Sequence, residues 1–410
     1  IAEQPTTDLR FQWRLLDFVD DGDRVTCRVE EFTTGRVETV ETAFLVGCDG
    51  GRSTVRRQLG IGYEGTSSLA SFVSVYFRAP DMINQHPFGH GNIFFPLHKD
   101  HRGFMLTWDD DQTYTYHLIL DEGQDWQDVD PVQVIKDVVG ADFEIDVHSV
   151  QPWDAHALVA ERYSEGRCFL AGDSAHLFSP TGGFGMNTGV SDAIELAWRL
   201  QAALDGWAGS ELLASYDHER RPIGHRNTQE AADCFDHLYR VMQHGDEIDE
   251  ESPEGDAVRQ MLKADIKEQE KLIASSGTLL GYRYEGSPIV VADGTPEPAD
   301  DARRYVPVAR PGHRAPHVWL DDGQALFDRL GPDFTLLRIG PDAPDVTPII
   351  DAAAVAGLPL QVLELAEPMV AEVYAASLVL IRPDLMIGWR SNECPEAELA
   401  AALVNTVRGA

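Results

Sequence analysis

The sequence is poor in cysteine and has no long apolar run. Five cysteines stand among 410 residues, an odd number without a Cys-x-x-Cys pair. This argues against a disulfide framework or a zinc site, and it is typical of a reducing compartment. No apolar stretch is long enough to cross a bilayer. No signal peptide is visible, although the chain begins with Ile1 rather than Met, which leaves an upstream targeting segment open. We expect a cytoplasmic protein that is not embedded in a membrane.

Positive charge is also scarce. Lys and Arg number 33 against 68 Asp and Glu, which gives a formal charge of −35 at pH 7. Such a chain repels the phosphates of nucleic acids and of anionic membranes, so neither is an expected partner. The hydrophobic share of 43% is that of an ordinary globular protein. The acidic residues are spread along the chain, and their simplest role is solubility.

Residue patterns predict a first part rich in strands and a middle part rich in helices. Strands are predicted over Leu9–Phe18, Arg24–Glu30, Val37–Ala43 and Phe44–Cys48. Between residues 70 and 150 the pattern predicts an antiparallel sheet with one face open to a ligand. Helices are predicted over Ser53–Leu59 with Ser53 as cap, Asp130–Val139 with Asp130 as cap, Ser191–Leu204, Tyr216–Arg221 and His225–Met242.

A polar stretch, Pro296–Arg303, is the predicted boundary of a C-terminal domain. Beyond it, short apolar strands alternate with helical patterns. The predicted strands are Phe334–Ile339, Leu360–Leu363, Ser377–Ile381 and Met386–Trp389, and the last helix is Glu396–Val407. This predicts a small separate α/β domain.

Two motifs carry the chemistry, and the first follows the strand that ends at Cys48. It reads Cys48-Asp49-Gly50-Gly51-Arg52-Ser53. Ligands of α/β folds bind where strands end, glycine lets the backbone approach a phosphate closely, and Arg52 offers guanidinium donors. Taken alone, an Asp-Gly-Gly turn is more often an ordinary connection between a strand and a helix.

The second motif is longer and more specific. Gly172-Asp173 follows the predicted strand Arg167–Leu170, where the Asp173 carboxylate can accept hydrogen bonds from sugar hydroxyls. A glycine-rich segment, Pro180-Thr181-Gly182-Gly183-Phe184-Gly185-Met186-Asn187, then leads into a helix. The missing side chains allow a flat ring to lie against the backbone, and the helix directs the positive end of its dipole at that ring.

With these motifs the sequence resembles the single-component flavoprotein aromatic hydroxylases, the family of phenol and hydroxybenzoate hydroxylases. The family's Asp-Gly motif corresponds to Asp49-Gly50 and its Gly-Asp motif to Gly172-Asp173, in the same order and with a β-rich segment between them. The stretch Gly281–Pro288 resembles the linker of members that have a C-terminal thioredoxin-like domain. The resemblance covers nearly the whole chain.

The resemblance implies a mixed α/β and α+β fold with four segments. Residues 1–65 would form part of an incomplete Rossmann-like FAD-binding domain, and 66–160 an antiparallel β-sheet substrate domain. Residues 161–295 would continue the FAD-binding domain and add helices, and 304–410 would form the thioredoxin-like domain.

It also implies the residues that bind FAD. Asp173 would bind the ribityl or pyrophosphate region, Pro180 would stand beside the isoalloxazine, and Asp49 would help to place the cofactor. The full set of implied FAD contacts is Asp49, Gly50, Arg52, Gly172, Asp173, Pro180, Gly182, Gly183, Gly185, Met186 and Asn187. Candidate substrate contacts in the β-rich middle are His98, Trp108 and Tyr116, and no metal is expected.

The sequence departs from the family pattern in two ways. It has no fingerprint in which a strand, Gly-x-Gly-x-x-Gly and a helix follow one another, so we expect the N-terminal dinucleotide-binding segment to be missing from this chain and the adenosine half of FAD to lack its site here. The C-terminal domain has no Cys-x-x-Cys pair, so it cannot perform dithiol chemistry. We therefore expect flavin reduction to survive deletion of the chain after about residue 305.

The implied reaction is hydroxylation of a phenolic or other electron-rich aromatic ring. NADPH or NADH would reduce FAD, O2 would add to it as a flavin hydroperoxide, and the terminal oxygen would attack the ring. The expected partners are thus a small aromatic substrate and O2, and a homodimer is left open. Alternatives are an epoxidase, reductase or halogenase on the same fold, although the halogenase pattern Trp-x-Trp-x-Ile-Pro is absent, or a carrier fragment without catalysis.

Overall fold

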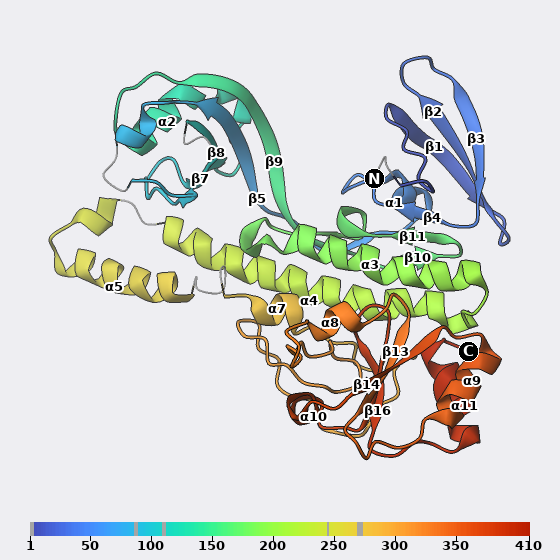
Figure 1. Ribbon diagram of the computed structural model, residues 1–410. Helices are drawn as coiled ribbons and strands as arrows, with labels where there is room; N and C mark the ends of the chain where they lie inside the picture. The colour runs from blue at the N-terminus through green and yellow to red at the C-terminus, as the bar shows by residue number, and fades with distance from the viewer. Residues whose placement is uncertain (1–3, 86–88, 109–111, 244–245, 269–273) are drawn as a thin grey trace.

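Two long helices form the central layer of the protein. The structure, a computed structural model, describes residues 4–85, 89–108, 112–243, 246–268 and 274–410. Helices α3 (Phe184–Asp205) and α4 (Ser210–Met242) run side by side. The sheets formed by β1 to β12 lie on one side of them and the C-terminal domain lies on the other (Figure 1).

The chain starts with an antiparallel sheet of three strands, β1 (Trp13–Asp20), β2 (Val25–Glu31) and β3 (Val37–Thr42). Strand β4 (Leu45–Gly47) and helix α1 (Thr54–Gln58) follow. Ser53 caps α1, since its hydroxyl accepts a hydrogen bond from the Arg56 backbone N–H at 2.9 Å. This confirms the predicted cap.

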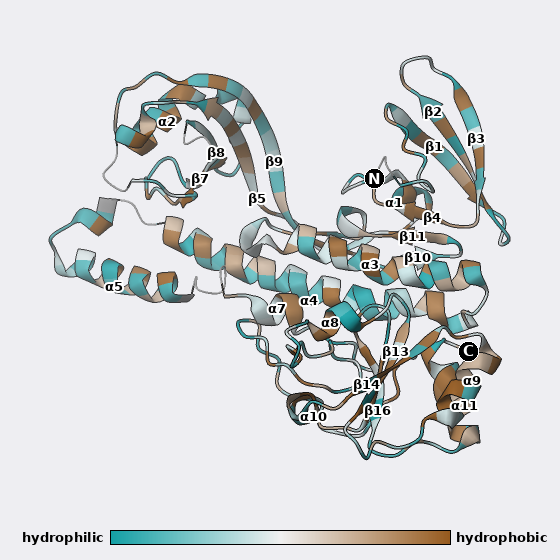
Figure 2. Ribbon diagram, viewed as in Figure 1, coloured by the Kyte–Doolittle hydropathy of each residue, from teal (hydrophilic) through white to brown (hydrophobic). Residues whose placement is uncertain are grey.

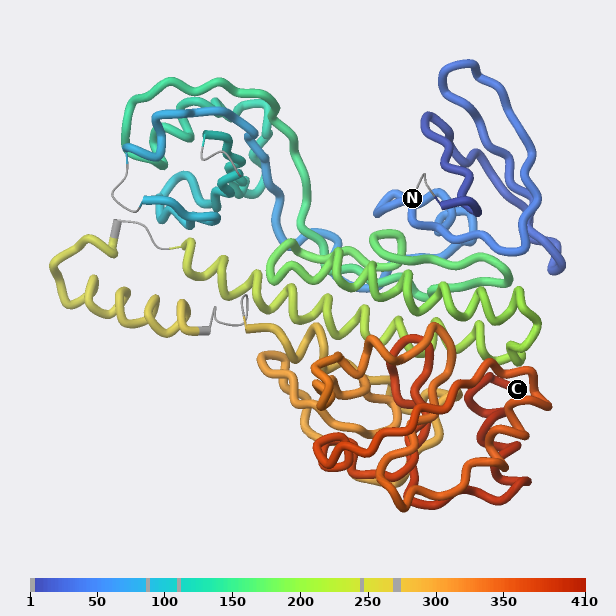
Figure 3. The backbone as a smooth tube through the Cα atoms, viewed as in Figure 1, coloured from blue at the N-terminus to red at the C-terminus, as the bar shows by residue number. Residues whose placement is uncertain are grey.

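A six-stranded sheet has the order β12-β9-β5-β8-β7-β6, and each neighbouring pair is antiparallel. Its long strands β5 and β9 rise together from the helical layer (Figure 3). The strands are β5 (Tyr63–Arg78), β6 (Ile93–Phe94), β7 (Gly103–Thr107), β8 (Thr113–Ile119), β9 (Asp146–Ala160) and β12 (His176–Leu177). The predicted antiparallel sheet is confirmed.

The two faces of this sheet have different partners. One face packs against α2 (Pro131–Val139) in a core that includes Val75 and Tyr116. The opposite face packs against α4, where Phe72 meets Phe235 and Leu238. Asp130 caps α2 by accepting from two backbone N–H groups at 3.1 Å, as predicted.

Helices α3 and α4 differ from the sequence prediction. Helix α3 begins at Phe184, not at Ser191, so half of the glycine-rich segment is helical. Helix α4 is continuous through Pro222, where a break was predicted. Proline removes one hydrogen bond from a helix. Close packing beside Pro222 offsets this loss, because the Gly224 backbone lies directly against the Tyr163 hydroxyl.

The C-terminal domain contains a four-stranded sheet with the order β14-β13-β15-β16. Strand β13 is parallel to β14, and the other pairs are antiparallel. The elements are β13 (Phe334–Ile339), α9 (Thr347–Ala356), β14 (Leu360–Leu365), α10 (Pro368–Tyr374), β15 (Leu378–Ile381), β16 (Ile387–Ser391) and α11 (Ala397–Val407). A β-α-β unit followed by an antiparallel pair agrees with the predicted small α/β domain, and its thioredoxin-like character stays a prediction.

This domain shares a core with the helical layer. Ala202, Trp207 and Leu212 from the α3–α4 region pack with Phe334 and Val404 of the C-terminal domain. Figure 2 shows that α9 and α11 are largely hydrophobic. The sequence predicted a separate domain, but the two parts are joined by buried apolar surface.

The remaining elements are short or peripheral. They are β10 (Ser164–Glu165), β11 (Cys168–Leu170), α5 (Pro253–Glu268), α7 (Ser276–Leu280), α8 (Leu326–Arg329) and the 3-10 turns η1 (Met82–Asn84), η2 (Trp126–Asp128), η3 (Gly172–Ser174), η4 (Thr181–Gly183) and η5 (Asp246–Asp249). Among the described residues no helix is long and apolar enough to span a membrane.

Candidate functional site

The strands that precede the two motifs lie side by side. Strand β4 pairs with β11 in parallel, with Gly47 opposite Leu170. Because parallel strands end at the same edge of a sheet, the Asp-Gly and Gly-Asp motifs emerge together. The Ala171 backbone N–H donates to the Gly47 carbonyl at 3.0 Å. Ligands of open α/β sheets bind at such an edge.

The Asp49 carboxylate is engaged within its own motif. It accepts from the Ser53 hydroxyl at 2.5 Å and from the Thr54 backbone N–H at 2.6 Å. Its side chain thus stabilises the start of α1 and orders the Gly50 turn, where φ is +77°. Arg52 is exposed, and among the described residues its guanidinium has no partner.

Tyr63 connects the first motif to the second. The Arg56 guanidinium lies over the Tyr63 ring, 3.8 Å from its centroid. The Tyr63 hydroxyl donates to the Asp173 carbonyl at 3.1 Å. The Asp173 side chain is exposed, and no partner holds its carboxylate within the described part of the chain. This carboxylate is therefore available at the edge where both strands end.

A buried ionic network holds the Gly172-Asp173 turn against α3. Asp192, fully buried on α3, accepts from the Gly172 N–H at 3.1 Å, from Arg220 at 2.9 Å and from His176 at 2.7 Å. Burial alone would raise the pKa of Asp192, but the charges of Arg220 and His176 outweigh it and hold this pKa below its ordinary value. The sequence analysis did not identify this network.

Close backbone packing reinforces that contact. A Cβ added at Gly189 would lie 3.1 Å from the Gly172 Cα, so a side chain at Gly189 would force the turn or the helix to shift. The Gly-Asp turn therefore lies against α3, the helix that begins within the glycine-rich segment.

The glycine-rich segment is fixed on α4 and then opens to solvent. The Thr181 hydroxyl donates to the Ala231 carbonyl of α4 at 2.7 Å. Gly182 and Gly183 have φ of +81° and +66°, a region that favours glycine. A Cβ at Gly183 would meet no atom within 4 Å. Helix α3 begins here without a side-chain cap and without an acidic residue in its first turn, so no described side chain of the cap position satisfies its first N–H groups.

Beside this segment lies a cavity of about 820 Å³. Its walls come from the glycine-rich segment, from strands β6 and β7 and from helices α4 and α5. The lining residues are Ile93, Phe95, Leu97, Phe104, Leu106, Pro180, Thr181, Gly182, Gly183, Leu238, Val241 and Ile266. Among these described residues none is charged, so the cavity suits an apolar, flat ligand.

The predicted substrate contacts are distributed over different places. Tyr116 is fully buried on the α2 face of the sheet, where its hydroxyl donates to the His101 carbonyl at 2.7 Å. We therefore withdraw Tyr116 as a substrate contact. His98 stacks on His101 with centroids 4.9 Å apart. Trp108 is 51% exposed and donates to Thr115 at 3.0 Å. Neither lines the cavity.

Sequence reasoning missed a polar group on the face of the sheet that packs against α4. Ser74, His117 and Trp153, from β5, β8 and β9, are joined by hydrogen bonds of 2.7 Å. The period of two along β8 could have separated Thr115 and His117 from Tyr114 and Tyr116. That signal does not say which face is turned toward a ligand.

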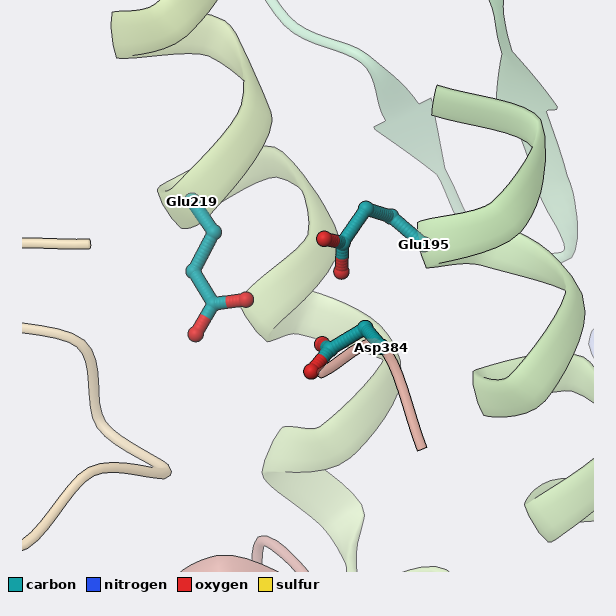
Figure 4. Close-up of side chains that lie close together, drawn as sticks. All are labelled: Glu195, Glu219 and Asp384. Carbon is teal, nitrogen blue, oxygen red and sulfur yellow. The ribbon is translucent and has the colours of Figure 1, made fainter. Parts of the chain in front are cut away.

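A second buried cluster joins α3, α4 and the C-terminal domain (Figure 4). Glu195, Glu219 and Asp384 place carboxylate oxygens within 4.8 Å of one another. Arg382 binds Glu219 through two bonds of 2.6 and 2.8 Å, and Arg199 binds Glu195 at 2.9 Å. The guanidinium groups already supply positive charge, so we assign no metal to this cluster.

Comparisons with known proteins agree on one kind of protein. The FAD binding domain family matches residues 1–231, and the family called aromatic-ring hydroxylase, C-terminal, matches residues 308–408. A 4-methyl-5-nitrocatechol 5-monooxygenase of a Burkholderia species is 34% identical over 98% of this chain and 75% of its own length.

Two solved structures extend the likeness to the fold. RebC, soaked with chromopyrrolic acid and bearing 7-carboxy-K252c, superposes with a TM-score of 0.87 at 32% identity, over 97% of this chain and 74% of its own. Aklavinone-11 hydroxylase in complex with FAD and aklavinone superposes with a TM-score of 0.80 at 30% identity, over 98% of this chain and 74% of its own.

Proposed function

Because the chain belongs to the FAD-dependent aromatic-ring hydroxylases, we propose that it hydroxylates a phenolic or similarly electron-rich ring with O2 and with electrons from NADH or NADPH. FAD dependence and monooxygenase chemistry on an aromatic substrate belong to the family as a whole. The nicotinamide cosubstrate, the roles of individual residues and the class of substrate are our proposals.

One observation carries this proposal: the apolar cavity is bounded on one side by Pro180–Gly183 and on another by the sheet. A flat ring bound along this segment would meet open space at Gly183, whereas the side-chain direction of Gly182 is filled by the Phe184 ring. An aromatic substrate lodged against Phe104 and Leu106 would then lie within the same cavity as that ring. Close approach in an enclosed apolar space is the condition for transferring oxygen without loss to water.

The residues present fit the flavin and ribityl end of FAD. The free Asp173 carboxylate is suited to accept hydrogen bonds from the ribityl hydroxyls. Arg52 is suited to contact a phosphate oxygen. The uncapped start of α3, next to Gly183 and Asn187, offers N–H donors to the pyrimidine edge. We assign no residue of this chain to the adenosine half, because the glycine fingerprint for it is absent from the sequence.

FAD, when bound, supplies the activation of O2. The protein's own residues bind, orient and exclude water. The α3 dipole would stabilise negative charge at the pyrimidine edge. Asp49 would act indirectly, since its carboxylate orders the Gly50 turn and the start of α1. Gly172 would act through its contact with Gly189, which sets the distance from Asp173 to α3.

The walls of the cavity favour a neutral substrate with more than one ring. A cavity of about 820 Å³ lies near the upper end of the usual range for small-molecule sites, roughly 300–1,000 Å³. An aromatic carboxylate would be buried there without a cation, because no charged side chain is among the described lining residues. A hydroxybenzoate or phenylpropanoid acid is therefore disfavoured against a polycyclic phenol.

The test is oxygen incorporation by the flavin-loaded protein. With ¹⁸O2, NADH or NADPH and a panel of monocyclic and polycyclic phenols, we expect substrate-stimulated nicotinamide oxidation and a product that has gained one labelled oxygen. An epoxidase would give a labelled epoxide or diol instead. A reductase would oxidise the nicotinamide without labelling the organic product, and that outcome would contradict hydroxylation.

A further inference from the structure

The polar group Ser74–His117–Trp153 lies on a sheet face that is otherwise occupied by aromatic side chains. The His117 ring stacks on Phe104 with centroids 4.6 Å apart, and Trp153 stacks on Phe72 at 4.3 Å. Phe104 itself lines the cavity beside the glycine-rich segment. His117 and Phe104 are direct partners across β8 and β7 and project from the same face. His117 is not itself a lining residue of the cavity; it stacks on Phe104, which is.

The hydrogen bonds in this group favour one placement of the proton on His117. The indole N–H of Trp153 is a donor only, so it donates to Ser74 Oγ at 2.7 Å. Among the described residues the Ser74 hydroxyl then has one acceptor for its own proton, His117 Nδ1 at 2.7 Å. With Nδ1 accepting, the hydrogen of the neutral imidazole is on Nε2.

The ring is neutral at ordinary pH, because burial lowers the pKa of His117 to about 4. Its Nε2–H has no hydrogen-bond partner within the described part of the chain. Nε2 is not among the described buried atoms that lack a partner, so it remains accessible to solvent or to a ligand. A donor held in one tautomer beside the cavity wall and not used by the protein is available to hydrogen-bond a ligand.

We propose that His117 binds an oxygen of the aromatic substrate through Nε2–H, with Ser74 and Trp153 as positioning residues that hold the tautomer. This rests on the proposed function, because it takes the cavity as the substrate site. A phenolic or carbonyl oxygen on the ring is the matching acceptor. A donor at a phenolic oxygen favours the phenolate over the phenol, and the phenolate is the form with the more electron-rich ring. In this arrangement Nδ1 accepts from Ser74 and Nε2 donates to the substrate. Neither nitrogen is free to take a proton from the substrate, so His117 does not act as a base.

The test compares two ligands that differ by one oxygen, 1-naphthol and naphthalene. Their dissociation constants are measured from the flavin absorbance change on binding to the oxidised, flavin-loaded protein without nicotinamide. We expect the wild type to prefer 1-naphthol by about tenfold, the scale of one hydrogen bond of about 1.4 kcal/mol. In His117→Phe this preference should disappear, while the binding of naphthalene changes little.

The positioning residues have their own signature. Ser74→Ala removes the group that holds the tautomer and should reduce the preference for 1-naphthol, whereas Ser74→Thr keeps a hydroxyl and should restore it. The matched control is His317→Phe, an exposed histidine of the C-terminal domain, which should keep the full preference.

A His117→Phe protein that retains flavin and prefers 1-naphthol as strongly as the wild type would overturn the proposal. Should that variant fail to fold, an unchanged preference in folded Ser74→Ala does the same. Because binding is measured without turnover, these outcomes are separate from a failure of the proposed hydroxylation, which the labelled-oxygen experiment detects.

Discussion

Asp173 is the residue on which cofactor binding most directly depends. Its exposed carboxylate stands at the common edge of β4 and β11, and its backbone is held by Tyr63 and by the neighbouring Asp192 network. The backbone is thus fixed while the side chain is left free, as expected of a group that binds a ligand rather than the protein.

We expect Asp173→Ala to weaken FAD binding by about tenfold or more, since a hydrogen bond to a charged group contributes about 1.5–3 kcal/mol. The measurement is the dissociation constant of FAD, obtained by titrating the flavin-free protein with FAD and following the change in flavin fluorescence. Asp128→Ala, another exposed aspartate, is the control. Equal flavin affinity in Asp173→Ala and the control would show that the carboxylate does not bind FAD.

A second residue-scale expectation concerns Asp192. In Asp192→Leu, Arg220 and His176 lose their shared buried partner, and an uncompensated buried charge costs about 3–5 kcal/mol. The midpoint of thermal unfolding should fall by several degrees, as followed by far-ultraviolet circular dichroism. Asp205→Leu changes a residue at the end of the same helix and should change the midpoint little. A wild-type midpoint for Asp192→Leu would mean that the network adds nothing to stability.

At the scale of elements, the critical contact is the one between the η3 turn and α3. Gly189→Ala would place a Cβ 3.1 Å from the Gly172 Cα, and the turn or the helix must shift by a few tenths of an ångström. Overpacking of this kind costs about 1–3 kcal/mol. We expect weaker FAD binding together with a lower unfolding midpoint. Ala197→Ser, also one atom larger and exposed on α3, should change neither. Undiminished FAD affinity in Gly189→Ala would show that this spacing does not set the position of Asp173.

Some element boundaries could be predicted from the sequence because local chemistry sets them. Ser53 and Asp130 each supply an acceptor for the first N–H groups of a helix, and both helices begin where these residues indicate. The start of α3 and the continuity of α4 could not be predicted. Gly185, Gly189 and Pro222 lower local helix propensity, and only packing across the fold outweighs this.

The same limit applies to the site. The spacing of the Gly-Asp motif indicated a turn beside a glycine-rich segment, and the structure places that turn against α3, which begins within the segment. The flavin contacts assigned to these residues stay a prediction. The alternation along β8 separates Tyr116 from His117, but it does not reveal that α2 covers the Tyr116 face. The choice of Tyr116 over His117 therefore depended on information that only the packing of the sheet contains.

At the scale of the whole molecule, the cluster around Glu195 should make stability depend on pH. Burial and the neighbouring Asp384 raise the pKa of Glu195 to about 8, and the Tyr284 hydroxyl donates to it at 2.6 Å. The folded protein thus holds a proton that the unfolded chain releases near its usual pKa of about 4.3. The contribution of Glu195 to the free energy of unfolding is complete below the unfolded pKa of about 4.3, and it is lost as pH rises through the folded pKa of about 8.

Glu195→Gln should flatten this dependence, because an amide stays neutral at both ends of the range. The measurement is the unfolding midpoint at pH 5.5 and at pH 8.5, with exposed Glu398→Gln as control. The wild type and the control should lose stability between the two pH values, and Glu195→Gln should lose distinctly less. Equal losses in all three proteins would remove Glu195 as the cause. Glu219 and Asp384 have pKa values that are lowered in the folded protein despite their burial. Their contribution to stability is lost as pH falls, below the range of pH 5.5 to 8.5 that is tested here.

The C-terminal domain is structurally continuous with the helical layer, which argues against the expectation that flavin reduction survives deletion after about residue 305. Deletion would expose Trp207 and Leu212, which pack against Phe334 and Val404, and would remove Arg382 from buried Glu219. We expect the shortened chain to aggregate or to lose flavin, as measured by size-exclusion chromatography with absorbance at the flavin bands.

Arg382→Met in the full chain isolates the ionic part: it keeps the apolar interface, so it should lower the unfolding midpoint while flavin remains bound. A shortened chain that stays monodisperse, retains flavin and is reduced by NADH or NADPH would show that the shared core is dispensable. It would also place the determinants of cofactor binding wholly before residue 305.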